Sequence, residues 1–319
     1  MKIFDGHTDI MADVVTRRKL GEKNVVKTHH LHKLKKGGVE GANFVLWMDP
    51  EASDWEDVKQ GITLIHDELR DSPDVFHPIK DMQDFACDKN NDKIDIILGM
   101  EGLAAMGPSI ERMEWLYEQG VRCASLTWNE ANALATGISG DPQRGLTDDG
   151  VQVLKTMDKL GILLDVSHLN ETSFWEVAGM ATKPFMASHS NAYTLCEHPR
   201  NLKDEQLLAI KDSGGLVGVN AVADFLHPDQ PDIMHFIQQV DYMVELLGID
   251  HVALGFDFCD FLHLDQQKEP EEQHVTTSLE TSMDIQNVIE KLAEKGYSHE
   301  DMVKLTKENF VRVYRHHLK

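Results

Sequence analysis

Short apolar runs recur along the chain at a spacing that suits alternating strands and helices. Two of them, at residues 162–166 and 184–187, are followed closely by His168 and His189. Parallel strands need a crossover connection, usually a helix, so segment 171–180 between these runs completes a predicted βαβ unit. In that unit both histidines emerge at the carboxyl ends of adjacent strands, where their imidazoles can converge on one point.

The same alternation predicts the fold of the whole chain. Helices with one apolar face follow several of the runs, as over 58–69 and 236–247. Alternating strands and helices form a parallel sheet, and eight strands favour closure into an α/β, (β/α)8 TIM-like barrel over an open doubly wound sheet. No linker-like segment interrupts the pattern, so residues 1–319 are expected to form one domain. The expected strands are 2–5, 41–47, 94–100, 121–128, 162–166, 184–187, 215–219 and 251–255.

Charge and composition narrow the possible partners. Asp and Glu number 54 against 31 Lys and Arg, a net charge of −23 that disfavours nucleic acid and anionic membrane surfaces. No run approaches the roughly eighteen apolar residues of a membrane span, and acidic residues break the apolar character of the first fifteen positions. Four cysteines without a CxxC indicate reduced thiols. We therefore expect a cytoplasmic protein that binds a small molecule, with no nucleic acid or membrane as partner.

Polar residues interrupt the apolar runs where several strands are expected to end. Chemistry in such barrels sits at the carboxyl ends of the strands. Imidazoles and carboxylates are the ligands that zinc and similar divalent ions take, and one zinc needs only three protein ligands. Six candidates therefore suggest two metals about 3.5–4 Å apart, bridged by a carboxylate and a hydroxide. The candidates are His7, Asp9, Glu101, His168, His189 and Asp257.

Each of these residues also has an ordinary structural explanation. A histidine at a strand end is commonly a hydrogen-bonded core residue, and Glu101 or Asp257 could serve a helix amino terminus. Cys259 could ligate a metal as thiolate, although a small packed residue is favoured. The remaining histidine clusters, at 29–32 and 316–317, are expected to be solvated.

Several spaced motifs carry a resemblance to a known family. They are DGHTD at 5–9, GMEG at 99–102, GLTDDGVQVLKTMDKLGILLDVSHL at 145–169, ASHSNAY at 187–193, RNLKDEQL at 200–207, GLVGVN at 215–220 and ENFVRVY at 308–314. Along essentially its whole length, the chain resembles the membrane (renal) dipeptidase family, peptidase family M19. The resemblance implies a metallo-dependent hydrolase barrel with two Zn²⁺ ions per chain, and a homodimer.

The resemblance also implies roles for particular residues. His7, Asp9 and Glu101 would hold one zinc, and Glu101 would bridge to a second zinc held by His168 and His189. Asp257 would handle the proton, as a carboxylate positioned for general acid–base work can. Arg200 would bind the terminal carboxylate of the substrate, which suits its planar fork of donors; its alternative is a surface salt bridge.

Further substrate contacts are expected from residues near the strand ends. Tyr193 and Asn220 are candidates by position. Where the family carries a histidine that steadies the substrate carbonyl, this chain has Trp128 followed by Asn129. Tryptophan can donate one N–H but cannot become cationic, so stabilisation of an oxyanion would fall to a metal, Asn129 or Asn132. Likewise, the family pattern GxDFDG is here Gly-Phe-Asp-Phe-Cys-Asp at 255–260.

These observations predict a binuclear zinc dipeptidase that hydrolyses the amide bond of free dipeptides through a metal-bridging hydroxide. The loop at 129–150 would close the pocket against longer peptides, and an acidic loop is expected at 260–273. Two alternatives stay open. One is a binuclear amidohydrolase for an N-acyl amino acid, a cyclic amide or a lactone, although HxD on the first strand and Glu101 in place of a modified lysine speak against its commoner form. The other, suggested by Trp128, is a non-catalytic metal-binding barrel.

Overall fold

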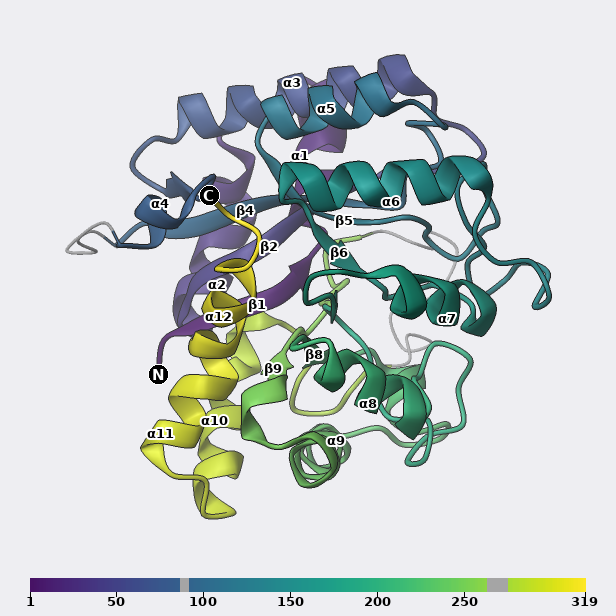
Figure 1. Cartoon of the computed structure of the whole chain (residues 1–319). Coiled ribbons are helices and arrows are strands. Elements are labelled where there is room, and N and C mark those ends of the chain that lie inside the picture. The colour runs from purple at the N-terminus through teal and green to yellow at the C-terminus, as the bar shows by residue number, and fades with distance from the viewer. Residues whose placement is uncertain (87–91, 263–274) are drawn as a thin grey trace.

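The computed structural model describes residues 1–86, 92–262 and 275–319, and its centre is a ring of parallel strands (Figure 1). Each strand of the ring pairs with the next ring strand along the chain, from β1 to β9, which confirms the predicted (β/α)8 barrel. The ring consists of β1 (Ile3–Thr8), β2 (Val39–Trp47), β4 (Ile94–Glu101), β5 (Val121–Ser125), β6 (Leu163–Asp165), β7 (Met186–Ala187), β8 (Leu216–Val219) and β9 (Val252–Leu254).

The barrel is nearly closed, and a side chain spans the seam between its first and last strands. β1 and β9 are the two ends of the hydrogen-bonded strand order. Asp5 Oδ1 on β1 accepts from the backbone N–H of Phe256, just after β9, at 3.0 Å. A Cβ added to Gly6 would lie 3.1 Å from the Cα of Gly255, so the absence of side chains lets the two segments approach closely.

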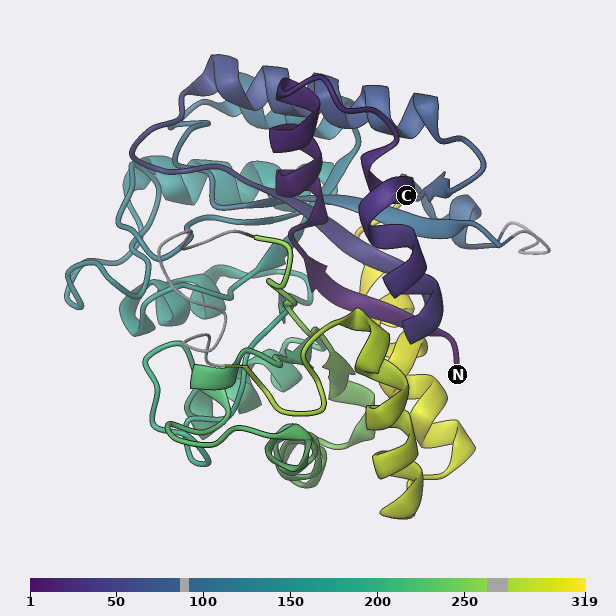
Figure 2. The same ribbon diagram turned by 180° about the vertical axis from the view of Figure 1, so that it is seen from behind.

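Helices surround the strands in both views (Figures 1 and 2). Side chains cap some of their amino termini, as at α3, where Asp54 Oδ1 accepts from the N–H groups of Glu56 and Asp57. Val58, Ile62 and Ile65 of the stripe predicted on this helix are buried. The helices are α1 (Ile10–Lys19), α2 (Leu31–Gly37), α3 (Trp55–Asp71), α4 (Met82–Ala86), α5 (Ile110–Glu118), α6 (Asp148–Leu160), α7 (Glu171–Met180), α8 (Asp204–Asp212), α9 (Ile233–Leu247), α10 (Ile285–Glu294), α11 (His299–Val303) and α12 (Asn309–Tyr314).

A second apolar core fills the inside of the barrel at the amino ends of the strands. It combines inward side chains of the strands, among them Phe4, Leu163 and Leu216, with residues of α12. Tyr314 on α12 donates its hydroxyl to Asn43 Oδ1 on β2 at 2.6 Å. Figure 1 shows α12 at the side of the molecule where both chain termini lie. This plug leaves the carboxyl ends of the strands as the place for a site.

The structure corrects several details of the sequence analysis. A short strand, β3 (Phe76–Pro78), pairs with β4 and was not predicted, since three residues that include a proline give no strand pattern. β5 ends at Ser125, three residues before the predicted end. His30 and His317, expected to be solvated, are both buried. Their rings bond to Asp13 Oδ2 at 2.8 Å and to the Pro184 carbonyl at 2.7 Å, partners distant in sequence.

Three further expectations concern the acidic loop, membrane-spanning helices and the cysteines. The predicted acidic loop at 260–273 falls mostly outside the described residues. Among the residues that are described, no helix has both the length and the apolar character needed to cross a membrane. Cys123, Cys196 and Cys259 are free thiols, and Cys87 lies outside the described ranges.

Candidate metal centre

The five predicted metal ligands meet at the carboxyl end of the barrel. They come from four strands and the residues just after them, and each is at most 7% exposed. Their ligand atoms form two overlapping groups, in each of which all the atoms lie within 4.8 Å of one another. One group is His7, Asp9 and Glu101, and the other is Glu101, His168 and His189.

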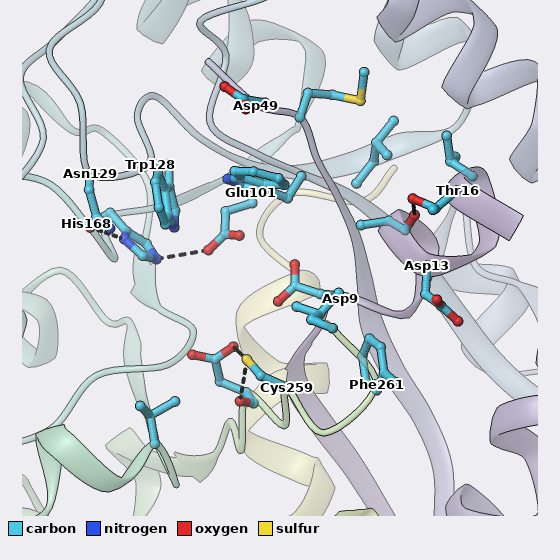
Figure 3. Close-up of a pocket in the computed structure, with 18 of the residues that line it drawn as sticks. Asp9, Asp13, Thr16, Asp49, Glu101, Trp128, Asn129, His168, Cys259 and Phe261 are labelled. Carbon is cyan, nitrogen blue, oxygen red and sulfur yellow. Dashed lines mark hydrogen bonds and ion pairs between the residues drawn. The ribbon is translucent and has the colours of Figure 1, made fainter. Parts of the chain in front are cut away.

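Glu101 is the residue that the two groups share. Its Oε1 lies 2.8 Å from His168 Nε2 and 3.5 Å from His189 Nε2. The same oxygen lies 3.6 Å from His7 Nε2, on the other side of the site. In Figure 3, the side chains of Asp9, Glu101 and His168 face a common space. One carboxylate therefore stands between two sets of nitrogen and oxygen donors.

The nitrogen and oxygen atoms of the site are better placed to ligate divalent cations than to form hydrogen bonds with one another. His7 Nε2 and Asp9 Oδ1 are buried without a hydrogen-bond partner among the described residues, although buried polar atoms nearly always have one. The Nε2 atoms of His168 and His189 lie 2.9 Å apart. Unpartnered imidazole nitrogens and carboxylate oxygens that converge in a buried space form the donor set that zinc takes. The residues present therefore fit two such ions.

Burial and mutual repulsion perturb the ionisation of the site. Burial raises the pKa of Glu101 well above its usual range, and the negative charge of Asp9 raises it further. Burial also keeps the pKa values of His168 and His189 well below 6.5. His7 behaves differently, because neighbouring carboxylates outweigh the effect of its burial and raise its pKa to about 10. The site thus holds the neutral imidazoles of His168 and His189 beside carboxylates that disfavour each other's ionisation, an environment that attracts cations.

Arg200 lies in the same site without a carboxylate partner. It is 7% exposed, and its Nη2 donates to the carbonyl of His189 at 3.4 Å. Within the described part of the chain its Nε has no partner and no carboxylate lies within ion-pair distance. The alternative considered from the sequence, that Arg200 forms a surface salt bridge, is therefore wrong. Desolvation lowers the pKa of the guanidinium, while Asp257 and Glu101 raise it.

Asp257 has a strained backbone and a perturbed carboxyl group. Its φ of 59° lies in the left-handed region, as does that of His168 at 74°, and such strain gathers at functional sites. Its Oδ1 lies 3.9 Å from His7 Nε2. Burial raises the pKa of Asp257 to about 6, with His7 opposing the shift. A carboxyl group that titrates near neutrality can both accept and donate a proton.

The predicted substrate contacts occupy different positions around a cavity of about 630 Å³. Trp128 and Asn129 line it, together with Arg200 and Asp257. Tyr193 lines a smaller cavity of about 170 Å³. Asn220 is fully buried and lines neither of these two cavities. Its amide instead donates to Asp257 Oδ2 at 3.0 Å and to the His189 carbonyl at 3.3 Å.

Comparison with known proteins places this arrangement in a family. Residues 1–318 match the family described as membrane dipeptidase (peptidase family M19). The chain belongs to this family. A Klebsiella pneumoniae protein, named as uncharacterized in the pqqA 5′ region, is 40% identical over 174 residues, 51% of this chain and 64% of that protein. An uncharacterized dipeptidase of Schizosaccharomyces pombe is 37% identical over 177 residues, 53% of this chain and 42% of that protein.

A solved metallopeptidase structure agrees with the fold of the whole chain. The Rhodobacter sphaeroides metallopeptidase, liganded with a phosphinate mimic of the dipeptide L-Ala-D-Ala, superimposes with a TM-score of 0.86. The comparison covers 99% of each chain at 23% sequence identity, so it shows a shared fold. By contrast, this chain spans less than two thirds of the length of the two curated relatives above.

Sequence reasoning missed three residues of this M19 site. Asp165 and Ser188 are buried beneath the histidines and bond to each other. Trp47 packs edge-on against Trp128 with ring centroids 5.4 Å apart and lines the cavity. Asp165 did leave a signal, as a charged residue inside an apolar run. Cys259 Sγ lies 3.4 Å from the Asp257 carbonyl, and burial raises its pKa, which fits a packed protonated thiol.

Proposed function

We propose that this protein is a binuclear zinc dipeptidase that cleaves the amide bond of free dipeptides. The observation that carries the proposal is the position of Glu101 Oε1, which lies within 3.6 Å of imidazole nitrogens in both ligand groups. A bridging carboxylate at this position would let His7 and Asp9 hold one ion and His168 and His189 the other. M19 membership supports this assignment.

The surrounding side chains suit both the proton transfer and the binding of the substrate carboxylate. When bound, paired zinc ions would polarise the amide carbonyl and supply hydroxide at neutral pH. Asp257, whose pKa is raised to about 6, would accept the proton and return it to the leaving amine. Asn220 would orient that carboxylate through its 3.0 Å hydrogen bond. Arg200 would bind the free carboxylate of the dipeptide, because no carboxylate among the described residues lies within ion-pair distance of its buried guanidinium.

The solved relative adds support for the substrate. The Rhodobacter sphaeroides protein binds a mimic of a dipeptide, and a cavity of about 630 Å³ that contains Arg200 and Glu101 gives this chain room for such a ligand. We further propose that residues 1–319 form one domain, that the protein forms a homodimer, and that it acts in the cytoplasm.

Metal analysis coupled to a substrate panel tests the proposal. Two zinc ions per chain and hydrolysis of free dipeptides are expected. The panel includes hydantoins, lactones and N-acetyl amino acids, because these compounds distinguish the amidohydrolase alternative from a dipeptidase. Turnover of those compounds without dipeptide hydrolysis would show that the protein is an amidohydrolase and not a dipeptidase. Two bound metals with no turnover of any compound would indicate a non-catalytic barrel.

A further inference from the structure

A buried hydrogen-bond network links the floor of the site to two of its imidazoles. Asp165, the last residue of β6, and Ser188, just after β7, are both nearly inaccessible to solvent. Asp165 Oδ1 accepts from the backbone N–H groups of Ser167 and Ser188, each at 3.0 Å. Asp165 Oδ2 accepts from the hydroxyl of Ser188. The carboxylate is thereby held by three donors, one of them a side chain.

The direction of these bonds determines where the serine proton lies. An ionised carboxylate only accepts, and a hydroxyl has a single hydrogen to donate. Because Ser188 gives that hydrogen to Asp165, its oxygen can only accept from other neighbours. The nearest is His189 Nδ1, at 2.7 Å, followed by His7 Nδ1 at 3.5 Å. His189 must therefore carry its proton on Nδ1, which leaves a lone pair on Nε2.

Asn129 orients the imidazole of His168 so that its proton also lies on Nδ1. His168 Nδ1 lies 2.8 Å from Asn129 Oδ1, a carbonyl oxygen that only accepts. This bond likewise puts the proton on Nδ1 and the lone pair on Nε2. The Nε2 atoms of His168 and His189 then both face Glu101 as acceptors. Neutral imidazole with a free Nε2 is the form that binds a metal.

The backbone of Ser188 is held in place by the close approach of three glycines. A Cβ on Gly6, Gly218 or Gly255 would lie 2.7, 2.0 or 1.8 Å from the Ser188 carbonyl oxygen. These glycines belong to β1, β8 and the segment after β9, so three elements enclose one peptide group. The hydroxyl therefore sits on a rigid part of the barrel, as supporting groups for metal ligands should.

We propose that Asp165 and Ser188 are positioning residues that fix the Nδ1–H tautomer of His189. The inference rests on the proposed two-metal site, although the hydrogen-bond directions that support it do not require a metal. Groups that hold the second ring nitrogen of a ligating histidine typically change metal affinity by about 10–100-fold.

The tautomer itself can be measured on the metal-free protein. Long-range ¹H–¹⁵N correlation spectra distinguish Nδ1–H from Nε2–H imidazole. Wild type should show His189 as the Nδ1–H form, and Ser188→Ala should shift it toward Nε2–H. Ser190→Ala is the matched control, because Ser190 is equally buried and its Oγ has no partner among the described residues. An unchanged His189 signal in Ser188→Ala would overturn the proposal.

Asp165→Asn gives a second and sharper test. The amide would donate to Ser188 Oγ, so the hydroxyl proton would turn toward His189 Nδ1 and force the Nε2–H form, which cannot ligate. Zinc affinity, measured by chelator competition, should fall about 10–100-fold in Ser188→Ala and further in Asp165→Asn. Adding Asp165→Asn to Ser188→Ala should cost no more than Ser188→Ala alone, because the hydroxyl is already gone.

The metal position at which zinc affinity falls distinguishes the positioning role of Ser188 from the proposed dipeptidase function. Zinc at the His168 and His189 position should weaken more than zinc at the His7 position, because the Ser188 contact to His189 is shorter. Equal affinities for Ser188→Ala, Asp165→Asn and Ser190→Ala would overturn the positioning role. A wild type that binds zinc without cleaving dipeptides would overturn the dipeptidase assignment alone, and the tautomer spectra would still decide the role of Ser188.

Discussion

At the amino end of the barrel the strands pack apolar side chains against α12, whereas at the carboxyl end the same strands present histidines and carboxylates. At the amino end the Tyr314 hydroxyl donates to Asn43, and the His317 ring bonds to the Pro184 carbonyl. At the carboxyl end His7 Nε2, Asp9 Oδ1 and Arg200 Nε lack partners among the described residues. The amino end is thus mainly an apolar core, whereas the carboxyl end gathers polar groups that a bound ion or substrate can satisfy.

This difference separates stability from function along one set of strands. Buried charges without partners cost stability, and functional sites keep them where chemistry requires. β8 illustrates both: Leu216 at its start lies in the inner core, and Asn220 directly after its end holds Asp257. Substitutions at the two ends should therefore affect different measurements.

The largest effect is expected for Glu101→Gln. Losing the shared carboxylate should lower kcat/KM by about 10³-fold or more, the equivalent of roughly 4 kcal/mol. The pKa of Glu101 is raised in the fold, so its charged form destabilises the metal-free protein as pH rises above the ordinary value. The metal-free variant should consequently melt no lower than wild type at pH 8. A large fall in that melting temperature would contradict the separation of the two ends.

Leu216→Ala should have the opposite profile. Leu216 is fully buried in the inner core, and removing such a side chain typically costs about 2–5 kcal/mol of unfolding free energy. Denaturant unfolding measures that loss, and zinc content with kcat of the remaining folded protein should stay within a few-fold of wild type. A loss of metal equal to that of Glu101→Gln would show that the two ends are coupled.

Arg200→Ala tests the part of the carboxyl end assigned to substrate. A hydrogen bond to a charged partner contributes about 1.5–3 kcal/mol, so KM for free dipeptides should rise roughly 10–100-fold. Carboxamide analogues of the same dipeptides serve as the internal control and should change little. If both kinds of substrate weaken equally, Arg200 does not bind the carboxylate.

The smallest effect concerns a buried histidine far from the metal ligands. Burial lowers the pKa of His317 to about 4. The unfolded chain therefore binds a proton below the ordinary pKa near 6.5, and His317 makes stability fall as pH drops from 6.5 toward 4. His317→Gln should reduce the loss of unfolding free energy between pH 7.5 and 5 by about 2 kcal/mol. His316→Gln, at an exposed position, should leave the pH dependence unchanged.

Much of the fold and the ligand set was predictable because each depends on local pattern. Apolar runs of strand length, separated by helical stripes, identified all eight strands of the ring. His7, Glu101, His168 and His189 follow from that topology, because parallel strands bring their carboxyl ends to one edge. Strand length was less predictable: β3 was missed and β5 was overextended, since pairing partners decide where a short strand begins and ends.

Only the tertiary structure decided how these residues act on one another. Ser188 lies next to His189 in sequence, but its function as an acceptor depends on Asp165, 23 residues away. Asn220 was expected to contact substrate and instead holds Asp257, and His30 is buried against Asp13. The sequence determined which chemical groups reach the mouth of the barrel. Burial, hydrogen-bond direction and the charges of residues remote in the chain determined their ionisation and orientation, because those depend on neighbours that only folding brings together.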